Sequence, residues 1–448
     1  MIGEAAGPRI PRARRRFPGA APREILALLI PGPEPRVPKL VLAYSGGLDT
    51  TTAIKWLTLE QGYDVIALNI DVGKSREQPV VESRGMAAGA VKVRVIDGKE
   101  DFIRYFAFPA LAAGAVYQDA YPLATALARP LLAKLLVDVA HEEGATAVAH
   151  GCTGKGNDQV RFDVGIQTLD PTLQIVAPTR ENAMARDYQI EYLRKHGIDI
   201  PWGQKGPFSI DENLWGRSAE AGVLEDPWAE PPAEAYEWTR SAEDAPSEPA
   251  YVEIGYEHGM PITLNGEAMT AVAMVEYLNE LGGVHGVGRI DHIEDRLVGI
   301  KSREIYEAPA AIILHTAHRA LEGMTLSKQQ IKLKKYIAQE YAELIYNGLW
   351  FSAHHQDIAA YVASTQRHVS GTIRVRLQRG TATVVGRQAK ESLYDRALAT
   401  YDRGDTYDQS AAVGFINIWG LQTRVQARQQ LLGQLPEALK IAMPREDS

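Results

Sequence analysis

Short apolar segments alternate with helical patterns through the first half of the chain. The segments that predict strands are nearly continuous apolar runs, and between them apolar residues recur at the three- and four-residue spacing of amphipathic helices. This alternation is typical of an α/β fold with a doubly wound parallel sheet. The predicted strands are KLVLAY (39–44), DVIALNIDVG (64–73), VKVRVIDG (91–98) and TAVAH (146–150).

The pattern changes in the second half, which reads as α+β. Alternating apolar and polar residues around central glycines predict two hairpins, and longer stretches with helical spacing lie between and beside them. A stretch rich in proline and acidic residues, 225–250, precedes the first hairpin and predicts a surface excursion. The predicted hairpins are 251–266 and 371–386, and the predicted helices are 268–283, 309–323, 327–347 and 353–369.

The two ends of the chain differ from its middle. Residues 1–37 hold seven Pro and seven Arg against three Glu, and we expect this arm to be poorly ordered. It resembles a transit peptide in composition, but a harmless extension or a mistaken start site explains it equally well. Residues 421–443 have the spacing of an amphipathic helix with Pro436 as a kink. That helix could pack on its own domain or embrace a neighbouring subunit.

A glycine-containing polar segment follows the first predicted strand. Its sequence is AYSGGLDTTT (43–52), and the apolar-periodic run after it predicts a helix beginning near Asp49 or Thr50. Two glycines let the backbone approach a ligand closely, and a helix N-terminus offers free N–H groups to an anion. The segment therefore predicts a phosphate-binding loop.

The same segment could be a plain glycine turn in which Asp49 caps the helix. The full SGGxD[ST] pattern after an apolar strand disfavours that interpretation. Neither GxxxxGK[ST] nor GxGxxG occurs in the chain, so the loop is neither a Walker-type site nor a Rossmann fingerprint.

Composition narrows the function classes. With 448 residues, 45% hydrophobic and 23% charged, the chain can form two or three ordinary globular domains. The net charge of −8 does not favour a nucleic-acid or membrane-surface binder. One cysteine, Cys152, excludes an internal disulfide and a thiolate metal cluster. No apolar stretch approaches the length of a membrane span, and we expect a cytoplasmic protein without membrane or nucleic-acid partners.

A second polar cluster, HGCTGKGNDQVR (150–161), follows the fourth predicted strand. Its three glycines can turn N–H groups toward an anion, and its Thr, Lys, Asn, Asp and Arg side chains gather polar groups in one place. Taken alone, it could be a solvated loop with Lys155 and Arg161 exposed. Because ligands bind at the carboxyl ends of parallel strands, this loop, the SGG loop and the NIDVG segment that ends the second strand are expected to share one edge of the sheet.

Together these two loops resemble those of the argininosuccinate synthase family, within the N-type ATP pyrophosphatase superfamily. The resemblance covers about residues 38–420. It implies an adenine nucleotide α-hydrolase-like ATP pyrophosphatase domain over 38–203, a synthetase and multimerisation domain over 204–420 and a helical oligomerisation arm over 421–448. Further matching segments, in this order, are EQGYDVIALNIDVG, YPLATALARP, SIDENLWGRS, GGVHGVGRIDHIEDR, KSREIYEAP and GFINIWG.

The resemblance implies that citrulline and aspartate are ligated at the expense of ATP, with Mg²⁺, through a citrullyl-adenylate. AMP and pyrophosphate are released, and the enzyme is expected to be a homotetramer. The ureido group of citrulline is a weak nucleophile and a still weaker electrophile. The protein must therefore align this group with ATP and neutralise the phosphate charges. The implied ATP site comprises Ala43, Tyr44, Ser45, Gly46, Gly47, Leu48, Asp49, Thr50, Thr51, Ile70 and Gly151.

The two amino-acid sites are also implied by the resemblance. The aspartate site comprises Thr153, Asn157 and Asp158, with Asp158 facing the ammonium group. A zwitterionic amino acid needs an anion and a cation at a fixed separation. The residues alone would also allow surface serines and a surface ion pair between Glu294 and Arg296. The implied citrulline site comprises Tyr121, Asn157, Arg161, Ser209, Ser218, Glu294 and Tyr306.

Two positions depart from the family pattern. Family members often carry Ser after the Thr of the YxLxTS segment, but here Ala126 follows Thr125, so one hydroxyl contact to citrulline is absent. Cys152 replaces the usual Ala, and we expect a packed small residue rather than a nucleophile.

Three other functions fit parts of the sequence. A tRNA-thiolating enzyme shares the SGG[VL]D loop, but commonly needs two catalytic cysteines or an iron–sulfur cluster and a basic RNA-binding face. An amidotransferase-type synthetase needs a glutaminase domain, for which the chain has no room. A degenerate ATP-binding regulator would have lost ligand residues, whereas Asp158, Arg161 and Glu294 are all present.

Overall fold

The structure of the protein is a computed structural model, and this structure describes residues 37–73, 78–182, 184–198 and 206–431. Apart from Val37, the N-terminal arm predicted to be poorly ordered lies outside the described residues. The same holds for residues 432–448 of the predicted terminal arm.

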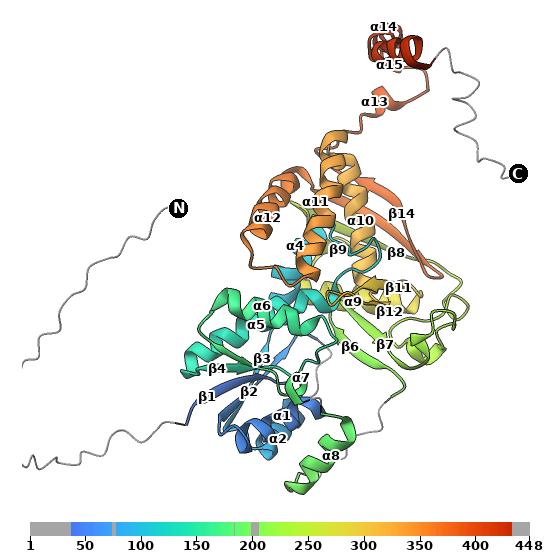
Figure 1. The fold of residues 1–448 in the computed structure, drawn as a ribbon. Coiled ribbons are helices and arrows are strands. Elements are labelled where there is room, and N and C mark those ends of the chain that lie inside the picture. Colours follow the sequence, from blue (N-terminus) through green and yellow to red (C-terminus); the bar gives the residue numbers. More distant parts are fainter. Residues whose placement is uncertain (1–36, 74–77, 183, 199–205, 432–448) are drawn as a thin grey trace, which may run out of the picture. The chain divides into compact units, whose positions relative to one another are not determined.

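A five-stranded parallel sheet forms the first half of the described chain (Figure 1). Its strand order is β3-β2-β1-β4-β5, so the predicted doubly wound sheet is confirmed, with β5 as a strand that the apolar pattern did not predict. The order reverses between β1 and β4, and this switch point is where open α/β sheets bind ligands. The strands are β1 Lys39–Ala43, β2 Asp64–Asp71, β3 Lys92–Asp97, β4 Ala147–Ala149 and β5 Gln174–Val176.

Helices cover both faces of this sheet. Leu40 and Leu42 of β1 belong to the apolar cluster on the side of α1, α2 and α8, whereas Val41 belongs to the cluster on the side of α4, α5 and α6. Alternate side chains of one strand therefore enter different cores, which explains why the strand is apolar throughout. The helices of this half are α1 Leu48–Leu59, α2 Gln78–Ala88, α3 Lys99–Phe102, α4 Phe108–Ala113, α5 Ala124–Glu143, α6 Asp158–Leu169, α7 Pro178–Asn182 and α8 Arg186–Lys195.

The second half contains two antiparallel sheets. The first, in the order β10-β9-β8-β13-β14, contains both predicted hairpins. Its strands are β8 Ala250–Glu257, β9 Met260–Leu264, β10 Glu267–Ala268, β13 Gly371–Gln378 and β14 Thr381–Gln388. The second sheet, in the order β11-β12-β7-β6, was not predicted from the apolar pattern, because its strands carry many charged residues. Its strands are β6 Ser209–Asn213, β7 Gly216–Glu220, β11 Arg289–Asp295 and β12 Lys301–Glu307.

Four long helices complete this half, and each matches a predicted helix within a few residues, α12 ending a turn early. The start of α11 is set by a capping box, in which Ser327 accepts from the Gln330 backbone and Gln330 bonds back to Ser327. The helices are α9 Ala271–Val284, α10 Pro309–Thr325, α11 Lys328–Tyr346 and α12 Ala353–Thr365.

The last described helices bury no residue. They are α13 Arg396–Ala399, α14 Ala411–Trp419 and α15 Leu421–Gln426. The predicted terminal helix is described only in its first part, as α15 and a π turn at Ala427–Leu431, and α14 precedes it as a separate short helix.

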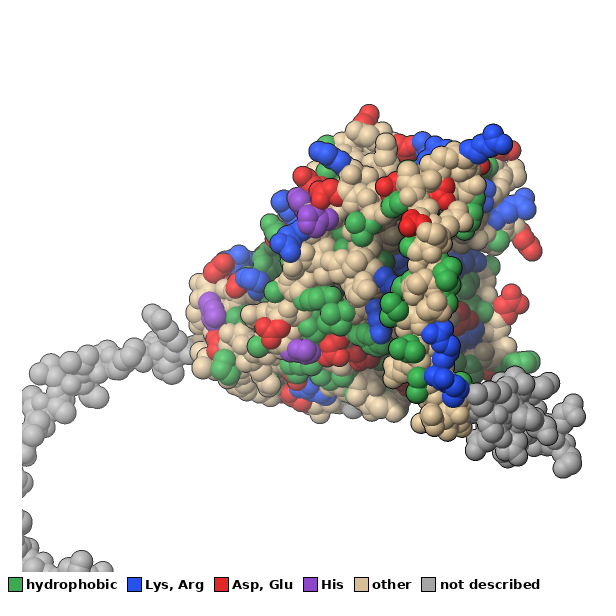
Figure 2. All heavy atoms as spheres, turned by 90° about the horizontal axis from the view of Figure 1, so that it is seen from above, with side chains coloured by type: hydrophobic (Ala, Val, Ile, Leu, Met, Phe, Trp, Pro, Cys, Tyr) green, Lys and Arg blue, Asp and Glu red, His purple; other side chains and the backbone are tan. Residues whose placement is uncertain are grey.

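None of the helices in the described part of the chain has the length and apolar character of a membrane span. On the face shown in Figure 2, acidic and basic side chains are interspersed rather than gathered into one field of charge.

Candidate active site

The loop between β1 and α1 presents backbone groups at the carboxyl edge of the parallel sheet. Gly46 has a φ of +70°, a left-handed conformation that favours glycine. Gly47 is the N-cap of α1, and no side chain caps the helix. Asp49 lies in the first turn, so the alternative in which Asp49 caps the helix is wrong. The first N–H groups of α1 are therefore available to an anion.

Hydroxyl groups line this loop. The Ser45 and Thr50 hydroxyls are 3.1 Å apart, and the Thr51 hydroxyl donates to the Gly47 carbonyl at 2.7 Å. The Tyr44 hydroxyl lies 3.3 Å from that of Thr51. These contacts order the loop from within.

Side chains from neighbouring elements hold the loop from outside. Asn69 on β2 donates to the Tyr44 carbonyl at 2.8 Å, and Arg84 on α2 donates to the Gly46 carbonyl at 3.1 Å. Ile70, the implied adenine contact, follows Asn69 on the strand beside β1 and is largely buried. The loop conformation is thus supported by two elements that adjoin β1 and α1.

The loop after β4 meets this first loop at the switch point of the sheet. β1 pairs with β4, with Leu42 opposite Ala149, so the two loops leave adjacent strands. A Cβ on Gly151 would lie only 3.0 Å from the Thr50 side chain. Glycine therefore allows the two loops to approach closely, and the prediction that they share one edge of the sheet is confirmed.

The second loop is not simply solvated. The Gln159 amide donates to the carbonyls of Gly154 and Gly156 at 2.5 and 3.3 Å, and Arg180 donates to the Gln159 oxygen at 3.3 Å. Lys155 is exposed, as the solvated-loop alternative expected, but Arg161 is only 5% exposed, which contradicts it.

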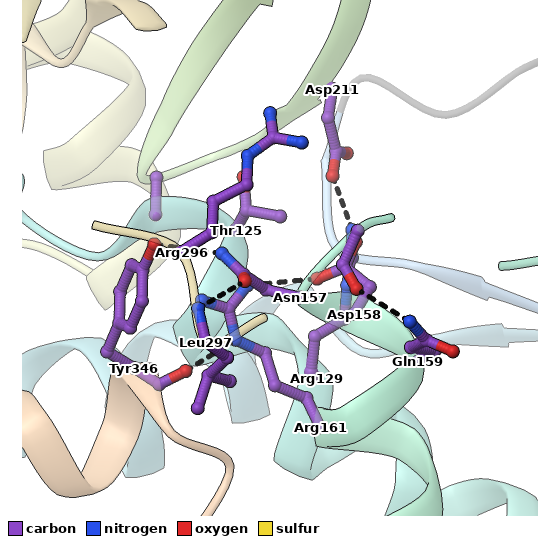
Figure 3. A network of polar contacts seen from close by, with 12 residues as sticks. Thr125, Arg129, Asn157, Asp158, Gln159, Arg161, Asp211, Arg296, Leu297 and Tyr346 are labelled. Atoms are coloured by element: carbon purple, nitrogen blue, oxygen red, sulfur yellow. Dashed lines mark hydrogen bonds and ion pairs between the residues drawn. The ribbon is translucent and has the colours of Figure 1, made fainter. Parts of the chain in front are cut away.

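Asp158, at the start of α6, lies in a network of charges drawn in Figure 3. Its Oδ2 accepts from Arg129 at 2.7 Å and its Oδ1 accepts from Arg161 at 3.0 Å. The same Arg129 nitrogen also donates to Asp211, which reaches in from β6. Burial opposes ionisation of Asp158, but the two guanidinium groups prevail and lower its pKa to about 2. Asp158 is therefore a fixed negative charge at neutral pH.

Asn157, the residue before Asp158, joins the two halves of the chain. Its amide nitrogen donates to the Tyr346 hydroxyl at 2.8 Å, and its oxygen accepts from the Leu297 backbone at 2.9 Å. Arg161 donates to the Tyr346 carbonyl at 2.9 Å, and its guanidinium group lies 4.8 Å from the centre of the Tyr346 ring. Tyr346 thus contacts two of the predicted site residues.

Glu294 lies buried beside this network. The Tyr306 hydroxyl donates to one carboxylate oxygen at 2.5 Å, and the Tyr346 hydroxyl donates to the other at 2.6 Å. Arg296 instead pairs with Glu220 and Glu304, so the alternative of a surface ion pair between Glu294 and Arg296 is wrong. Glu294 is only 3% exposed.

Two pairs of stacked tyrosines line the same region. The rings of Tyr121 and Tyr306 are 4.1 Å apart, and those of Tyr117 and Tyr346 are 3.7 Å apart. Each pair joins a residue of the 113–123 segment to a residue of the second half. The Tyr121 hydroxyl accepts from the Thr125 backbone at 2.9 Å.

The predicted serines are less firmly held. Ser218 on β7 lies opposite Tyr306 on β12 and opposite Asp211 on β6, which places it next to the network. Ser209 lies two residues before Asp211 on β6 and is exposed. Ser209 and Thr153 make no side-chain hydrogen bond among the described residues. The side chains of Ser209 and Thr153 are exposed. The other predicted amino-acid-site residues lie together in the structure: Tyr121, Asn157, Asp158, Arg161, Ser218, Glu294 and Tyr306.

Three residues of the network were not predicted as site residues. Arg129 and Asp211 lie within quoted family segments, YPLATALARP and SIDENLWGRS, and their charge was the available signal. Tyr346 lies at the end of α11, outside any quoted segment, and nothing in its sequence context distinguishes it.

The two departures from the family pattern are both small residues packed against the core. Ala126 is completely buried on α5. Cys152 is partly buried against the core, and burial raises the pKa of its thiol. A neutral thiol is a poor nucleophile, which agrees with the expectation that Cys152 is a packing residue.

Two sequence models of one family match this chain. Residues 39–199 match the model described as "Arginosuccinate synthase N-terminal HUP domain", and residues 208–426 match "Arginosuccinate synthase C-terminal domain". The chain belongs to the argininosuccinate synthase family. The family consists of ligases that form a carbon–nitrogen bond and use ATP as a substrate, so the doubly wound sheet of this chain is the HUP domain of such an enzyme.

Individual relatives agree with the family models. The argininosuccinate synthase of Dehalococcoides mccartyi (strain CBDB1) is 55% identical over 392 residues, which cover 88% of this chain and 97% of that protein. That of Geobacillus thermodenitrificans is 55% identical over 87% of this chain and 96% of its own, and that of Symbiobacterium thermophilum is 54% identical over 88% and 98%. The similarity therefore spans both halves of the chain.

Proposed function

We propose that this argininosuccinate synthase family member ligates L-citrulline to L-aspartate, with a citrullyl-adenylate as intermediate and AMP and pyrophosphate as products. The observation that carries the proposal is the close approach of the two glycine loops, since a Cβ added to Gly151 would lie only 3.0 Å from the Thr50 side chain. Asn157 and Asp158 follow directly and connect this junction to the buried network of Glu294. A nucleotide site and a site for zwitterionic amino acids thus adjoin each other.

The chemistry requires alignment above all. The ureido oxygen of citrulline attacks the α-phosphorus of ATP and pyrophosphate leaves. The aspartate amine then attacks the activated carbon and AMP leaves. Residues 43–51 would bind the triphosphate through backbone N–H groups and hydroxyls, with Ile70 and Gly151 at the nucleoside end. Held N–H groups stabilise charge that moves between phosphate oxygens without reorganising.

The magnesium ion would arrive with the nucleotide. The described residues contain no group of three or more His, Cys, Asp or Glu side chains that could hold a metal ion by themselves. Mg²⁺ is commonly bound by one or two carboxylates together with substrate phosphates. Asp49, exposed in the first turn of α1, is the carboxylate of this loop that fits such a role. The ion would neutralise phosphate charge.

The aspartate substrate would lie along the second loop. Asp158 would face its ammonium group, and the low pKa of Asp158 supports this, because the carboxylate is ionised at neutral pH. Asn157 and the exposed hydroxyl of Thr153 would contact its carboxylates. Arg129, which donates to Asp158, adds positive charge beside them.

Citrulline would be held between the two halves of the chain. Glu294 would face its ammonium group and Arg161 its carboxylate. Tyr121, Tyr306, Ser209, Ser218 and Asn157 would supply neutral hydrogen bonds. Ala126 contributes no hydroxyl, so this chain makes one contact fewer than relatives with Ser at that position.

A product analysis tests the proposed reaction. Purified protein is incubated with ATP and Mg²⁺, with and without citrulline and aspartate, and the nucleotides and pyrophosphate are quantified. We expect AMP and pyrophosphate only when citrulline is present, and argininosuccinate only with both amino acids. Release of ADP, or equal turnover without citrulline, would reject the proposal.

We also propose a homotetramer held in part by the C-terminal arm. α14 and α15 bury no residue, and within the arm the described helix α15 exposes the apolar side chains of Leu421 and Val425. Exposed apolar surface of this kind marks an interaction site. Truncation after Gly420 should lower the molar mass measured by light scattering, and an unchanged oligomer would reject the role of residues 421–448.

Domain limits and location remain proposals of the same kind. The limits are 38–203 for the nucleotide-binding domain and 204–420 for the synthetase domain. A cytoplasmic location without nucleic-acid or membrane partners is proposed from composition.

A further inference from the structure

We propose that Asp211 is a catalytic residue, which accepts the proton that the aspartate amine loses when it attacks the citrullyl-adenylate. The inference rests on the proposed function and adds a role that the family resemblance did not assign to any residue. It follows from how Asp211 and Asp158 share one arginine.

Asp211 reaches the network from the second half of the chain. It lies on β6, opposite Ser218 on β7, and its Oδ2 accepts from the Arg129 nitrogen that also donates to Asp158 (Figure 3). Two carboxylates from distant segments thus share one guanidinium group, at the proposed ammonium-binding position of the aspartate substrate.

The two carboxylates differ in what occupies their oxygens. Both oxygens of Asp158 accept from guanidinium groups, one from Arg129 and one from Arg161. Asp211 receives a single guanidinium contact, and its second oxygen has no hydrogen-bond partner among the described residues. The Asp211 side chain is 40% exposed, against 27% for Asp158. Asp211 therefore has an oxygen free to accept a proton from a bound ligand.

The electrostatic surroundings of the two carboxylates also make Asp211 the better proton acceptor. The charged or titratable groups around Asp211 are Arg129 on α5, Asp158 and Arg161 on α6, and Cys152 in the second loop. Partial burial of the carboxyl group, together with the charge of Asp158, raises the pKa of Asp211 although Arg129 opposes the shift. The pKa of Asp158 is instead lowered to about 2. Asp211 is the stronger base of the pair.

The ammonium group of aspartate loses two protons in the ligation step. Asp158 stays ionised throughout and holds the ammonium group, whose first proton passes to water before the attack. The amine nitrogen then forms the new carbon–nitrogen bond, and the bond between carbon and the AMP oxygen breaks. The electron pair of that bond leaves on AMP, and the second proton passes to the free oxygen of Asp211. Since this side chain is part exposed, the proton can then leave to water.

The test separates the two half-reactions with Asp211→Asn, whose amide oxygen can still accept from Arg129. Adenylation is followed as citrulline-dependent exchange of labelled pyrophosphate into ATP without aspartate, and ligation as argininosuccinate formation. We expect exchange to be retained, whereas kcat for ligation falls by about 100-fold or more, the usual loss for a general base. The acidic limb of the kcat pH profile should disappear.

Three further variants serve as controls for the Asp211→Asn experiment. Asp211→Glu should recover part of the ligation rate, and added formate should accelerate Asp211→Ala. Asp158→Asn should raise the KM for aspartate and keep the acidic limb. Native-like circular dichroism and a thermal unfolding midpoint near that of the parent establish that each variant is folded.

The inference would be overturned by unchanged ligation in folded Asp211→Asn, or by an acidic limb of the kcat pH profile that persists in this variant. Loss of exchange and ligation together in the folded variant would also overturn it, since Asp211 would then serve adenylation. If the parent protein itself showed no citrulline-dependent exchange, the proposed function would fail, which is distinguishable from a failure of Asp211.

Discussion

The proposed nucleotide loop and the proposed amino-acid pocket are built in different ways. The loop is one continuous segment, 43–51, which would bind its ligand mostly through backbone N–H groups and hydroxyls. The pocket is assembled from side chains between residues 121 and 346, and its central carboxylate, Glu294, is held by tyrosines from two other elements. A site built from backbone groups should be lost when the backbone changes conformation. A site built from side chains should instead weaken step by step as single side chains are replaced.

The largest predicted effect tests the backbone character of the loop. Gly46→Val places a β-branched residue at a φ of +70°, which costs on the order of 1–3 kcal/mol if the loop keeps its shape. We expect the loop to change shape instead, so that ATP binding, measured by calorimetry, is lost while the fold persists.

A matched glycine separates strain from site geometry. Gly62 has a φ of +69° in the turn after α1, with nothing within 4 Å of an added Cβ. Gly62→Val should therefore lower stability by a similar amount and leave ATP affinity unchanged. Equal nucleotide affinity in both variants would contradict the assignment of the loop.

The next effect concerns the charged part of the pocket. Asp158→Asn removes a carboxylate that holds two guanidinium groups, and breaking such a pair costs about 2–5 kcal/mol. We expect the KM for aspartate to rise by about 100-fold, which corresponds to 2.7 kcal/mol, with ATP–pyrophosphate exchange partly kept. Asp170→Asn, at the other end of α6, is the control, and full activity of Asp158→Asn with aspartate would refute the assigned role.

A smaller effect tests whether the pocket depends on single hydroxyl groups. Tyr346→Phe removes the donor to Glu294 and the acceptor for Asn157. A lost hydrogen bond to a charged group is worth about 1.5–3 kcal/mol, so the KM for citrulline should rise by about 10- to 100-fold. The KM for ATP should stay the same.

Tyr341 supplies the comparison for this variant. It lies on the same helix and is buried, and its hydroxyl has no hydrogen-bond partner among the described residues. Tyr341→Phe should leave both KM values unchanged. An equal rise in the two variants would mean that packing of α11, and not the Tyr346 hydroxyl, controls citrulline binding.

The smallest effect lies in the packing beside α11. The rings of His355 and Trp350 are 4.3 Å apart and tilted, and burial lowers the pKa of His355 to about 4. Between pH 6.5 and 4, His355 binds a proton in the unfolded chain but not in the folded chain. The free energy of unfolding therefore falls as the pH falls. His355→Phe should reduce the drop in thermal midpoint between pH 7 and 5 by a few °C. His354→Gln, an exposed neighbour, should not change it.

The sequence predicted the conformation of the loop better than the arrangement of the pocket, for a physical reason. A glycine loop before a helix is local: Gly46, Gly47 and the helix after them are contiguous, so their spacing is enough to predict the loop. The charged strands β6, β7, β11 and β12 have no apolar period, and their sheet was missed. The pocket residues on them could be named only through the family resemblance.

The parallel sheet, its two glycine loops and the family to which the chain belongs can all be predicted from the amino-acid sequence. Apolar periodicity and glycine spacing are local properties, so they can be read from the order of the residues. The folded structure was needed to find that Arg129 is shared by Asp158 and Asp211, and that Tyr346 joins Glu294 to Asn157. These contacts span up to 189 residues of chain, and no local pattern records which distant side chains will meet when the sheets pack.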